Sequence, residues 1–147
     1  MARKSPKFKQ GYFQPKNPNK YRGKHVPIYR SGWELAFMRL CDGHPNVECW
    51  ASESHSIPYR NPFTGKMTRY IPDFLLSYAD KNGKKHIELV EVKPSKQAGL
   101  TESRSKKDKA AVILNKAKWT AAQEWCKRRG IKFRIVTENE IYHKPQK

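Results

Sequence analysis

The sequence predicts an α/β domain with an extended basic arm at its N-terminal end. Two runs, 69–76 and 87–93, are rich in β-branched and aromatic residues, as strands are. Between them lies 80–84, whose Asn-Gly dipeptide is the strongest short-range signal for a hairpin turn. Two further segments, 31–41 and 109–129, repeat apolar residues at helical spacing. Strands and helices in a single short chain therefore define the fold class.

Composition limits the kinds of partner. The 147 residues fit one domain by the usual length prior. They include 31 Lys and Arg against 13 Asp and Glu, a formal net charge of +18. Such a surplus favours a polyanion, usually nucleic acid, over a basic surface that is merely solvated. No apolar run approaches the roughly 20 residues of a membrane span, and three scattered cysteines without a Cys-x-x-Cys pattern fit reduced thiols in a cytoplasmic compartment.

We divide the chain into an arm at 1–26, a folded domain at 27–141 and a short tail at 142–147. The arm contains no acid, since the first acidic residue is Glu34, and its prolines prevent a long helix. Its aromatic residues alternate with Lys and Arg. They could stack on bases while the cations neutralise phosphates, or they could dock on the protein's own domain. Both interpretations remain open.

The first helix is expected from Ser31 to about Cys41. Ser31 is a good N-cap, and Glu34 falls at the third helical position, which together make a capping box. Glu34 has a second interpretation, as a carboxylate that reaches a bound cation from the helix N-terminus. The residues expected to face the core are Trp33, Phe37 and Leu40.

A polar, basic stretch at 95–109 predicts a loop, and a long helix is expected to follow over about 109–129. Gly130 is well placed to end that helix, and the alternating apolar residues of 131–136 predict a closing strand. Trp119 is expected in the core. The apolar stripe of the helix is predicted to consist of Ile113, Leu114, Ala117, Ala121 and Trp125.

Acidic residues on the two hairpin strands carry the functional prediction. Strand side chains alternate between faces, so Glu91 and Lys93 point the same way, and a closed hairpin brings Asp73 close to Glu91. Oxygen ligands of this kind, with the backbone carbonyl of Val92, suit Mg²⁺, with Mn²⁺ as a substitute. Lys93 would then orient or deprotonate the attacking water, or stabilise the transition state. The pattern predicts metal-dependent phosphodiester cleavage; the alternative is an exposed ion pair between Glu91 and Lys93.

Other polar residues have weaker predictions. Glu53 either supports the cation site from outside or is a solvated loop acid, and the second is favoured. A lone basic residue is more often a surface charge than a phosphate contact. The residues expected to contact DNA phosphates are Arg30, Arg69, Lys96 and Lys118.

The motifs of this chain resemble a known nuclease superfamily. Pro72-Asp73 followed by Glu91-Val92-Lys93, with Glu34 on the preceding helix, resembles the PD-(D/E)XK pattern. More closely, the chain resembles the head completion nucleases of large contractile-tailed phages over most of its length. The matching segments are Pro15-Lys16-Asn17, Lys20-Tyr21-Arg22-Gly23, Tyr29-Arg30-Ser31, Trp33-Glu34, Trp50, Ser52-Glu53, Ile57-Pro58-Tyr59, Arg69-Tyr70, Glu91-Val92-Lys93-Pro94, Lys118-Trp119, Ala121-Ala122, 129–135 and Thr137-Glu138.

The resemblance implies a restriction-endonuclease-like mixed β-sheet flanked by helices, with 27–141 as the nuclease domain. It implies a metal site at Glu34, Asp73 and Glu91, with Lys93 as the catalytic lysine. The implied substrate is packaged double-stranded DNA or its end, and the implied partners are phage head or portal and neck proteins. It places the protein in the host cytoplasm during assembly, with incorporation into the virion head as a further option. The same nuclease core is similar to the DNA-cutting subunit of some heteromeric transposases.

Two rival functions remain open. One is a non-catalytic structural protein that binds the DNA end or the portal; it would bind DNA in a salt-sensitive manner without hydrolysis. The other is a transposon or restriction-type nuclease, which would need sequence-specific cutting, and no recognition domain is visible in the sequence.

Overall fold

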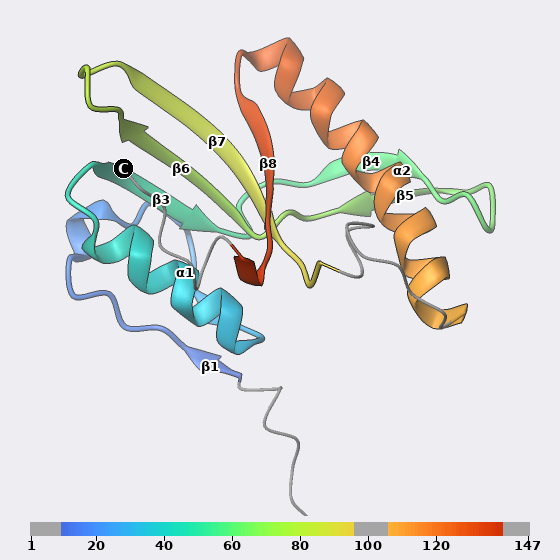
Figure 1. Ribbon diagram of the computed structural model, residues 1–147, viewed down its shortest axis with the longest axis horizontal. Helices are drawn as coiled ribbons and strands as arrows, with labels where there is room; N and C mark the ends of the chain where they lie inside the picture. The colour runs from blue at the N-terminus through green and yellow to red at the C-terminus, as the bar shows by residue number, and fades with distance from the viewer. Residues whose placement is uncertain (1–9, 96–105, 140–147) are drawn as a thin grey trace, which may run out of the picture.

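The computed structural model describes residues 10–95 and 106–139 (Figure 1). Most of the expected elements are present, in the expected order. In chain order they are β1 (Gly11–Tyr12), the 3-10 helix η1 (Pro18–Lys20), β2 (Ile28–Tyr29), α1 (Gly32–Gly43), β3 (Val47–Ser52), β4 (Ile57–Arg60), β5 (Met67–Tyr70), β6 (Phe74–Ala79), β7 (Lys85–Val92), α2 (Lys106–Arg129) and β8 (Lys132–Val136).

A four-stranded sheet in the order β3-β6-β7-β8 forms the centre of the domain. The β3/β6 and β6/β7 pairs are antiparallel, while β7 and β8 are parallel, so the sheet is mixed as expected. Because side chains alternate along β7, Val90 packs in a cluster with α1 and Leu89 in a second cluster with α2. The two helices therefore cover opposite faces of the sheet, which confirms the mixed sheet flanked by helices (Figure 1).

The expected hairpin forms, but its first strand is shorter than predicted. The connection at 80–84 closes as expected, with the Gly83 amide donating to the Asp80 carbonyl at 2.9 Å and Gly83 at a φ of 83°. The run 69–76 was predicted as one strand and is two, because it breaks at 71–73. Pro72 has no N–H for a ladder bond and restricts the residue before it. The upstream half, β5, pairs with β4, and only β6 pairs with β7.

Helix α1 begins as predicted, with one difference in its capping. The Ser31 hydroxyl accepts the Glu34 N–H at 3.1 Å, which confirms the N-cap. In a standard capping box the carboxylate of Glu34 would bind the Ser31 amide. Here it instead accepts the amide of Arg30 at 3.0 Å, one residue earlier in the chain. The cap is thereby extended to the segment that precedes the helix.

The core face of α1 is rotated from the predicted one. Phe37 is buried as expected and Trp33 is partly buried, but Leu40 is 36% exposed. Met38 and Cys41 are fully buried in its place. The predicted stripe was wrong at Leu40 because Met and Cys were not counted among the core residues, although both pack well in irregular interiors.

Helix α2 begins at Lys106, so 106–109 is helical where a loop was predicted, and 96–105 lies outside the described residues. Gly130, at a φ of 70°, ends the helix as expected. Of the predicted stripe, Ile113 is wrong, being 49% exposed, whereas the other four members pack at the margin of the α2 cluster. The residues that α2 buries most deeply are Asn115, Trp119, Ala122 and Cys126.

Part of the basic arm is fastened to the domain. Phe13 is buried, and Tyr21 packs edge-on against Trp50 with ring centroids 4.7 Å apart. The buried Asp42, near the end of α1, accepts the backbone amides of Lys16 at 2.9 Å and Asn17 at 3.0 Å. Docking on the protein's own domain is therefore correct for Phe13 and Tyr21. The division at 26/27 and 141/142 stays a prediction.

Strand β8 pairs with the edge of β7 opposite β6 and supports the end of β7. Beyond the paired residues, the Lys93 amide donates to the Val136 carbonyl at 3.0 Å. Ser95 is then bound through its amide and hydroxyl to the Glu138 carboxylate, at 3.0 and 2.8 Å. The backbone on both sides of Pro94 is thus held by residues from the end of the described chain. In the described part of the chain, neither helix has the length and apolarity of a membrane-spanning segment.

Candidate active site

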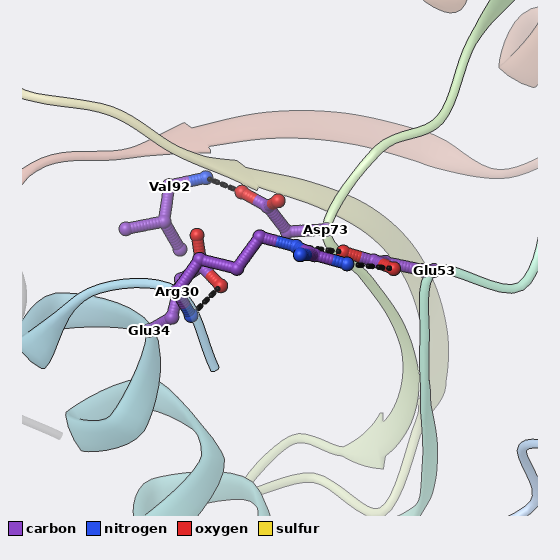
Figure 2. Close-up of polar contacts among 5 residues, drawn as sticks. All are labelled: Arg30, Glu34, Glu53, Asp73 and Val92. Carbon is purple, nitrogen blue, oxygen red and sulfur yellow. Dashed lines mark hydrogen bonds and ion pairs between the residues drawn. The ribbon is translucent and has the colours of Figure 1, made fainter. Parts of the chain in front are cut away.

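Asp73 and Glu91 meet where β6 and β7 come together. The register of this pair sets Phe74 opposite Val90, so Asp73 and Glu91 are the next opposed positions. Asp73 lies just before β6, and its Oδ2 accepts the Val92 amide at 2.8 Å (Figure 2). The hairpin therefore brings the two acids together, as the sequence predicted. The carbonyl of Val92, expected as a metal ligand, stays a prediction; what binds Asp73 is its N–H.

Glu91 and Lys93 point to the same side, as expected for alternate strand positions. The Lys93 Nζ lies 3.5 Å from Glu91 Oε2, and Tyr70 donates its hydroxyl to Glu91 Oε1 at 2.9 Å. The Glu91 side chain is only 7% exposed. An exposed surface ion pair is therefore the wrong description, because the carboxylate is buried and held by two donors. Burying a carboxylate is costly unless it is paired and hydrogen-bonded, and Tyr70 and Lys93 supply those partners to Glu91.

Glu34 lies within electrostatic range of the other two acids. Burial, followed by the charges of Glu53 and Glu91, raises the pKa of Glu34. Burial and the charges of Glu91 and Glu34 raise the pKa of Asp73 well above its usual value. The pKa of Glu91 is raised by burial, against the opposing effects of Lys93 and Tyr70. The N-terminus of α1 and the β6–β7 pair therefore place three acids around one region, where Glu91 disfavours the ionised forms of both Asp73 and Glu34.

The donor set fits a hard divalent cation in part. Magnesium keeps several waters and is often held by only one or two carboxylates, a requirement that Asp73 and Glu91 satisfy. In 10–95 and 106–139, however, no group of three or more His, Cys, Asp or Glu side chains has the arrangement of a metal site. Glu34 in particular is directed to the Arg30 amide. Its place as a third ligand therefore stays a prediction.

Glu53 lies close to the acids, in line with the less favoured of its two interpretations from the sequence. It follows β3 and forms a side-on pair with Arg30, at 3.1 Å from Nε to Oε2 and 3.3 Å from Nη2 to Oε1 (Figure 2). Glu53 is therefore a partly exposed acid paired with Arg30, and its support of a cation site stays a prediction. Glu53 has a φ of 48°, and its amide donates to the Asp73 carbonyl at 2.8 Å. Sequence patterns give no signal for such a backbone conformation in a glutamate.

The expected DNA-contacting residues differ in their placement. Arg30 lies within range of the acids, because the charges of Glu53, Glu34 and Asp73 all raise its pKa. The Lys118 Nζ lies 5.6 Å from the centre of the Tyr70 ring, and burial together with the charge of Lys93 lowers the pKa of Lys118. Arg69 is bonded to Ser56 on the exposed β4–β5 hairpin. Lys96 lies outside the described residues.

Tyr70 is a residue that sequence reasoning did not single out. It is the last residue of β5, and its side chain is buried between Glu91 and Lys118. The strand break after Tyr70 lets β5 leave the main sheet while its last side chain returns to the site. Tyr70 lies near Asp73 in the sequence, but the contact of Tyr70 with Glu91 depends on that strand break.

Comparison with known proteins identifies the family. The family model described as TnsA-like endonuclease N terminal matches residues 44–138 of this chain, more than half of its length. The chain belongs to the TnsA-like endonuclease family. The match supports the restriction-endonuclease-like fold, and it includes Asp73, Glu91, Lys93 and Glu53, whereas Arg30 precedes it.

This TnsA-like chain is also similar to a curated phage protein. It is 38% identical over 142 residues to the "Head completion nuclease" of Enterobacteria phage T4. The alignment covers 89% of this chain and 92% of the phage protein. The resemblance stated from the motifs is thus confirmed, and the TnsA-like chain shares nearly the full length of a protein named as a nuclease.

Proposed function

We propose that this protein is a divalent-metal-dependent DNA endonuclease that acts in phage head completion. The observation that carries the proposal is the meeting of Asp73, Glu91 and Lys93 at one end of the β6–β7 pair, within a TnsA-like domain. Two acids and an amine on a rigid sheet are the groups that phosphodiester hydrolysis requires.

Different residues of the chain would have different roles in the reaction. Asp73 and Glu91 would hold Mg²⁺ or Mn²⁺, with Glu34 and the Val92 carbonyl as further ligands. A bound divalent cation would supply Lewis-acid activation of water and neutralise charge at the phosphate. Lys93, held 3.5 Å from Glu91, would orient or deprotonate the attacking water, or stabilise the transition-state charge. Tyr70 would keep Glu91 in place through its hydroxyl.

Double-stranded DNA is the proposed substrate. The net charge of +18 favours a polyanion, and the backbone of a duplex offers one. Arg30 and Lys118 lie beside the acids and would contact the phosphates next to the cleaved bond. Arg69 would contact a phosphate farther away, and Lys96, which lies outside the described residues, is a further proposed phosphate contact. Phosphate contacts carry no sequence information directly, so we propose cutting without strong sequence preference.

The biological setting is proposed from the phage relative. We propose that the protein acts on packaged DNA or its end before a virion is finished, with head or portal and neck proteins as partners. It would work in the host cytoplasm during assembly, with incorporation into the virion head as a further possibility.

A non-catalytic function is the second candidate. The observation that favours it is the orientation of the acids, since Glu34 faces Arg30 and no group of three acids among the described residues is arranged as a metal site. In that case the protein would bind a DNA end or the portal without hydrolysis. A transposon or restriction-type nuclease remains the third candidate, favoured only by the family match.

A plasmid assay tests the proposal. Purified protein is incubated with supercoiled plasmid in Mg²⁺, Mn²⁺ or EDTA, beside Asp73→Asn, Glu91→Gln and Lys93→Ala. Wild type should cut only with a metal ion, and each variant should cut at least about 100-fold more slowly, the scale of a lost acid–base group. Glu124→Gln is the matched control, because it breaks the exposed Arg128–Glu124 pair on the far part of α2. Tight DNA binding without cutting in any metal would favour the non-catalytic candidate.

A further inference from the structure

The pairing of Arg30 with Glu53 leaves one edge of the guanidinium open. A guanidinium has two forks, one side-on through Nε and Nη2 and one end-on through Nη1 and Nη2. Glu53 takes the side-on fork at 3.1 and 3.3 Å. Among the described residues, Nη1 has no hydrogen-bond partner, and the Arg30 side chain is 50% exposed. The end-on fork can therefore accept an anion without breaking the pair.

Arg30 is fixed at both ends beside the candidate metal ligands. Its amide donates to Glu34 Oε1 at 3.0 Å, so its backbone is tied to the first turn of α1. Its guanidinium reaches across to Glu53, alongside the carboxylate of Asp73 (Figure 2). The guanidinium of Arg30 therefore lies within electrostatic range of Asp73 and Glu34, two of the candidate metal ligands.

The backbone at Glu53 is held in a costly conformation. Its φ of 48° lies in the left-handed region, which L-residues other than Gly, Asn and Asp seldom adopt. The residue is kept there by its amide bond to the Asp73 carbonyl at 2.8 Å. Strain of this kind is commonly retained at functional sites. Here the conformation directs the carboxylate of Glu53 to Arg30.

We propose that Glu53 is a positioning residue, which holds Arg30 side-on so that its end-on fork binds the phosphate next to the cleaved bond. This inference rests on the proposed nuclease function and adds to it a specific arginine clamp. Glu53 itself touches neither phosphate nor cation. It acts through Arg30, as a carboxylate that orients a charged ligand.

Cutting rates under single-turnover conditions test the positioning role. With saturating DNA and metal, Glu53→Gln should slow cutting by roughly 10- to 100-fold, the scale for a misplaced reacting group. Its affinity for duplex DNA in EDTA should be equal or higher, because the change removes a negative charge. A rate equal to that of wild type would overturn the inference.

A double-mutant cycle separates positioning from a merely structural role. If Glu53 acts through Arg30, Arg30→Ala with Glu53→Gln should cut no more slowly than Arg30→Ala alone. Multiplied losses would show that Glu53 has a separate role and would contradict the proposal. Glu53→Asn checks folding, because Asn adopts the left-handed region with less strain. It should melt at no lower temperature than wild type and still cut slowly, whereas Glu124→Gln should change neither property.

If wild type cuts no DNA, the nuclease proposal is overturned. An NMR measurement then still tests whether Glu53 positions Arg30. The Nε–H signal of Arg30, identified with Arg30→Lys, should show restricted motion in wild type and free motion in Glu53→Gln. Adding a duplex oligonucleotide in EDTA should shift it in wild type. If the motion of the Nε–H group is the same in Glu53→Gln as in wild type, or if DNA does not shift its signal, the clamp is ruled out.

Discussion

Tyr70 shows how one hydroxyl can support a catalytic acid. It donates to Glu91 Oε1, while its ring lies beneath the ammonium of Lys118. Glu91 thus has one oxygen held by Tyr70 and the other near Lys93. Mutating a group that orients a metal ligand typically lowers metal affinity or activity by about 10- to 100-fold. The role of Tyr70 can therefore be measured separately from the chemistry.

We expect Tyr70→Phe to raise the Mg²⁺ concentration for half-maximal cutting by roughly 10-fold, because Glu91 loses its orienting bond while the ring under Lys118 remains. A metal titration of the plasmid assay measures this. Tyr78→Phe is the matched control, since it removes a hydroxyl bonded to Glu88 at 2.8 Å on the other face of β7. An unchanged titration for Tyr70→Phe would show that Glu91 is held sufficiently by Lys93 alone.

At the residue level, sequence reasoning succeeded where the signals were local. Asp73, Glu91 and Lys93 meet because alternation and a closed hairpin are sufficient to bring them together. Tyr70 was missed and Glu53 was not favoured, because their contacts depend on a strand break and on a left-handed backbone, respectively. Neither feature leaves a periodic pattern, although Pro72 was a visible reason to expect the break.

At the scale of elements, the N-terminal arm is attached to helix α1 through Asp42. Asp42 receives the amides of Lys16 and Asn17 through its carboxylate, and its carbonyl accepts the side chains of Asn17 at 2.9 Å and Lys20 at 3.0 Å. The same segment leads through β2 to Arg30. The docking of the arm and the placement of Arg30 are therefore parts of one connected path.

We expect Asp42→Ala to lower the free energy of unfolding by roughly 1–3 kcal/mol, because two backbone amides lose a charged acceptor near a buried site. It should also make 10–26 more accessible to trypsin, since the backbone amides of Lys16 and Asn17 lose their carboxylate acceptor. Urea denaturation and limited proteolysis measure the two effects. Glu124→Ala, on an exposed pair, should change neither property. A fully resistant arm in Asp42→Ala would show that the packing of Phe13 and Tyr21 and the bonds to the Asp42 carbonyl are enough to hold it.

The helices show why element existence is easier to predict than the buried face. Both helices were predicted, with Ser31 and Gly130 as correct terminal signals. The face of α2 was shifted because its deepest set includes the polar Asn115, which no apolar count selects. On α1, Met38 and Cys41 displaced Leu40 for a similar reason. The mixed sheet came from the family resemblance, since strand order across a crossover is not encoded locally.

At the scale of the whole molecule, the acid cluster opposes folding when no cation is present. Asp73, Glu91 and Glu34 are gathered in one region, where the charge of Glu91 raises the pKa of Asp73 and of Glu34. Among the described residues, the basic side chains close to these acids include Lys93, Arg30 and Lys118. A ligand that binds only the folded state stabilises it by mass action. Stability should therefore report on cation binding without any assay of cutting.

We expect Mg²⁺ or Mn²⁺ to raise the melting temperature of wild type, and Asp73→Asn to abolish the rise. In EDTA, Asp73→Asn should melt no lower than wild type, because it removes one of three repelling buried carboxylates while an amide oxygen still accepts the Val92 N–H. Differential scanning fluorimetry in EDTA and in each metal measures this. An equal rise in wild type and variant would place the cation elsewhere.

The parallel pairing of β7 with β8 has a consequence for how the protein is made. Lys93 takes its backbone acceptor from Val136, and Ser95 is fastened by Glu138, so the reactive amine is anchored by residues translated some forty positions later. While a ribosome is still synthesising that stretch, the nascent chain already contains both acids and the lysine but lacks the backbone acceptor of Lys93 and the carboxylate that binds Ser95. The backbone on both sides of Pro94 can therefore be fixed in its final register only after residues 136–138 have been added.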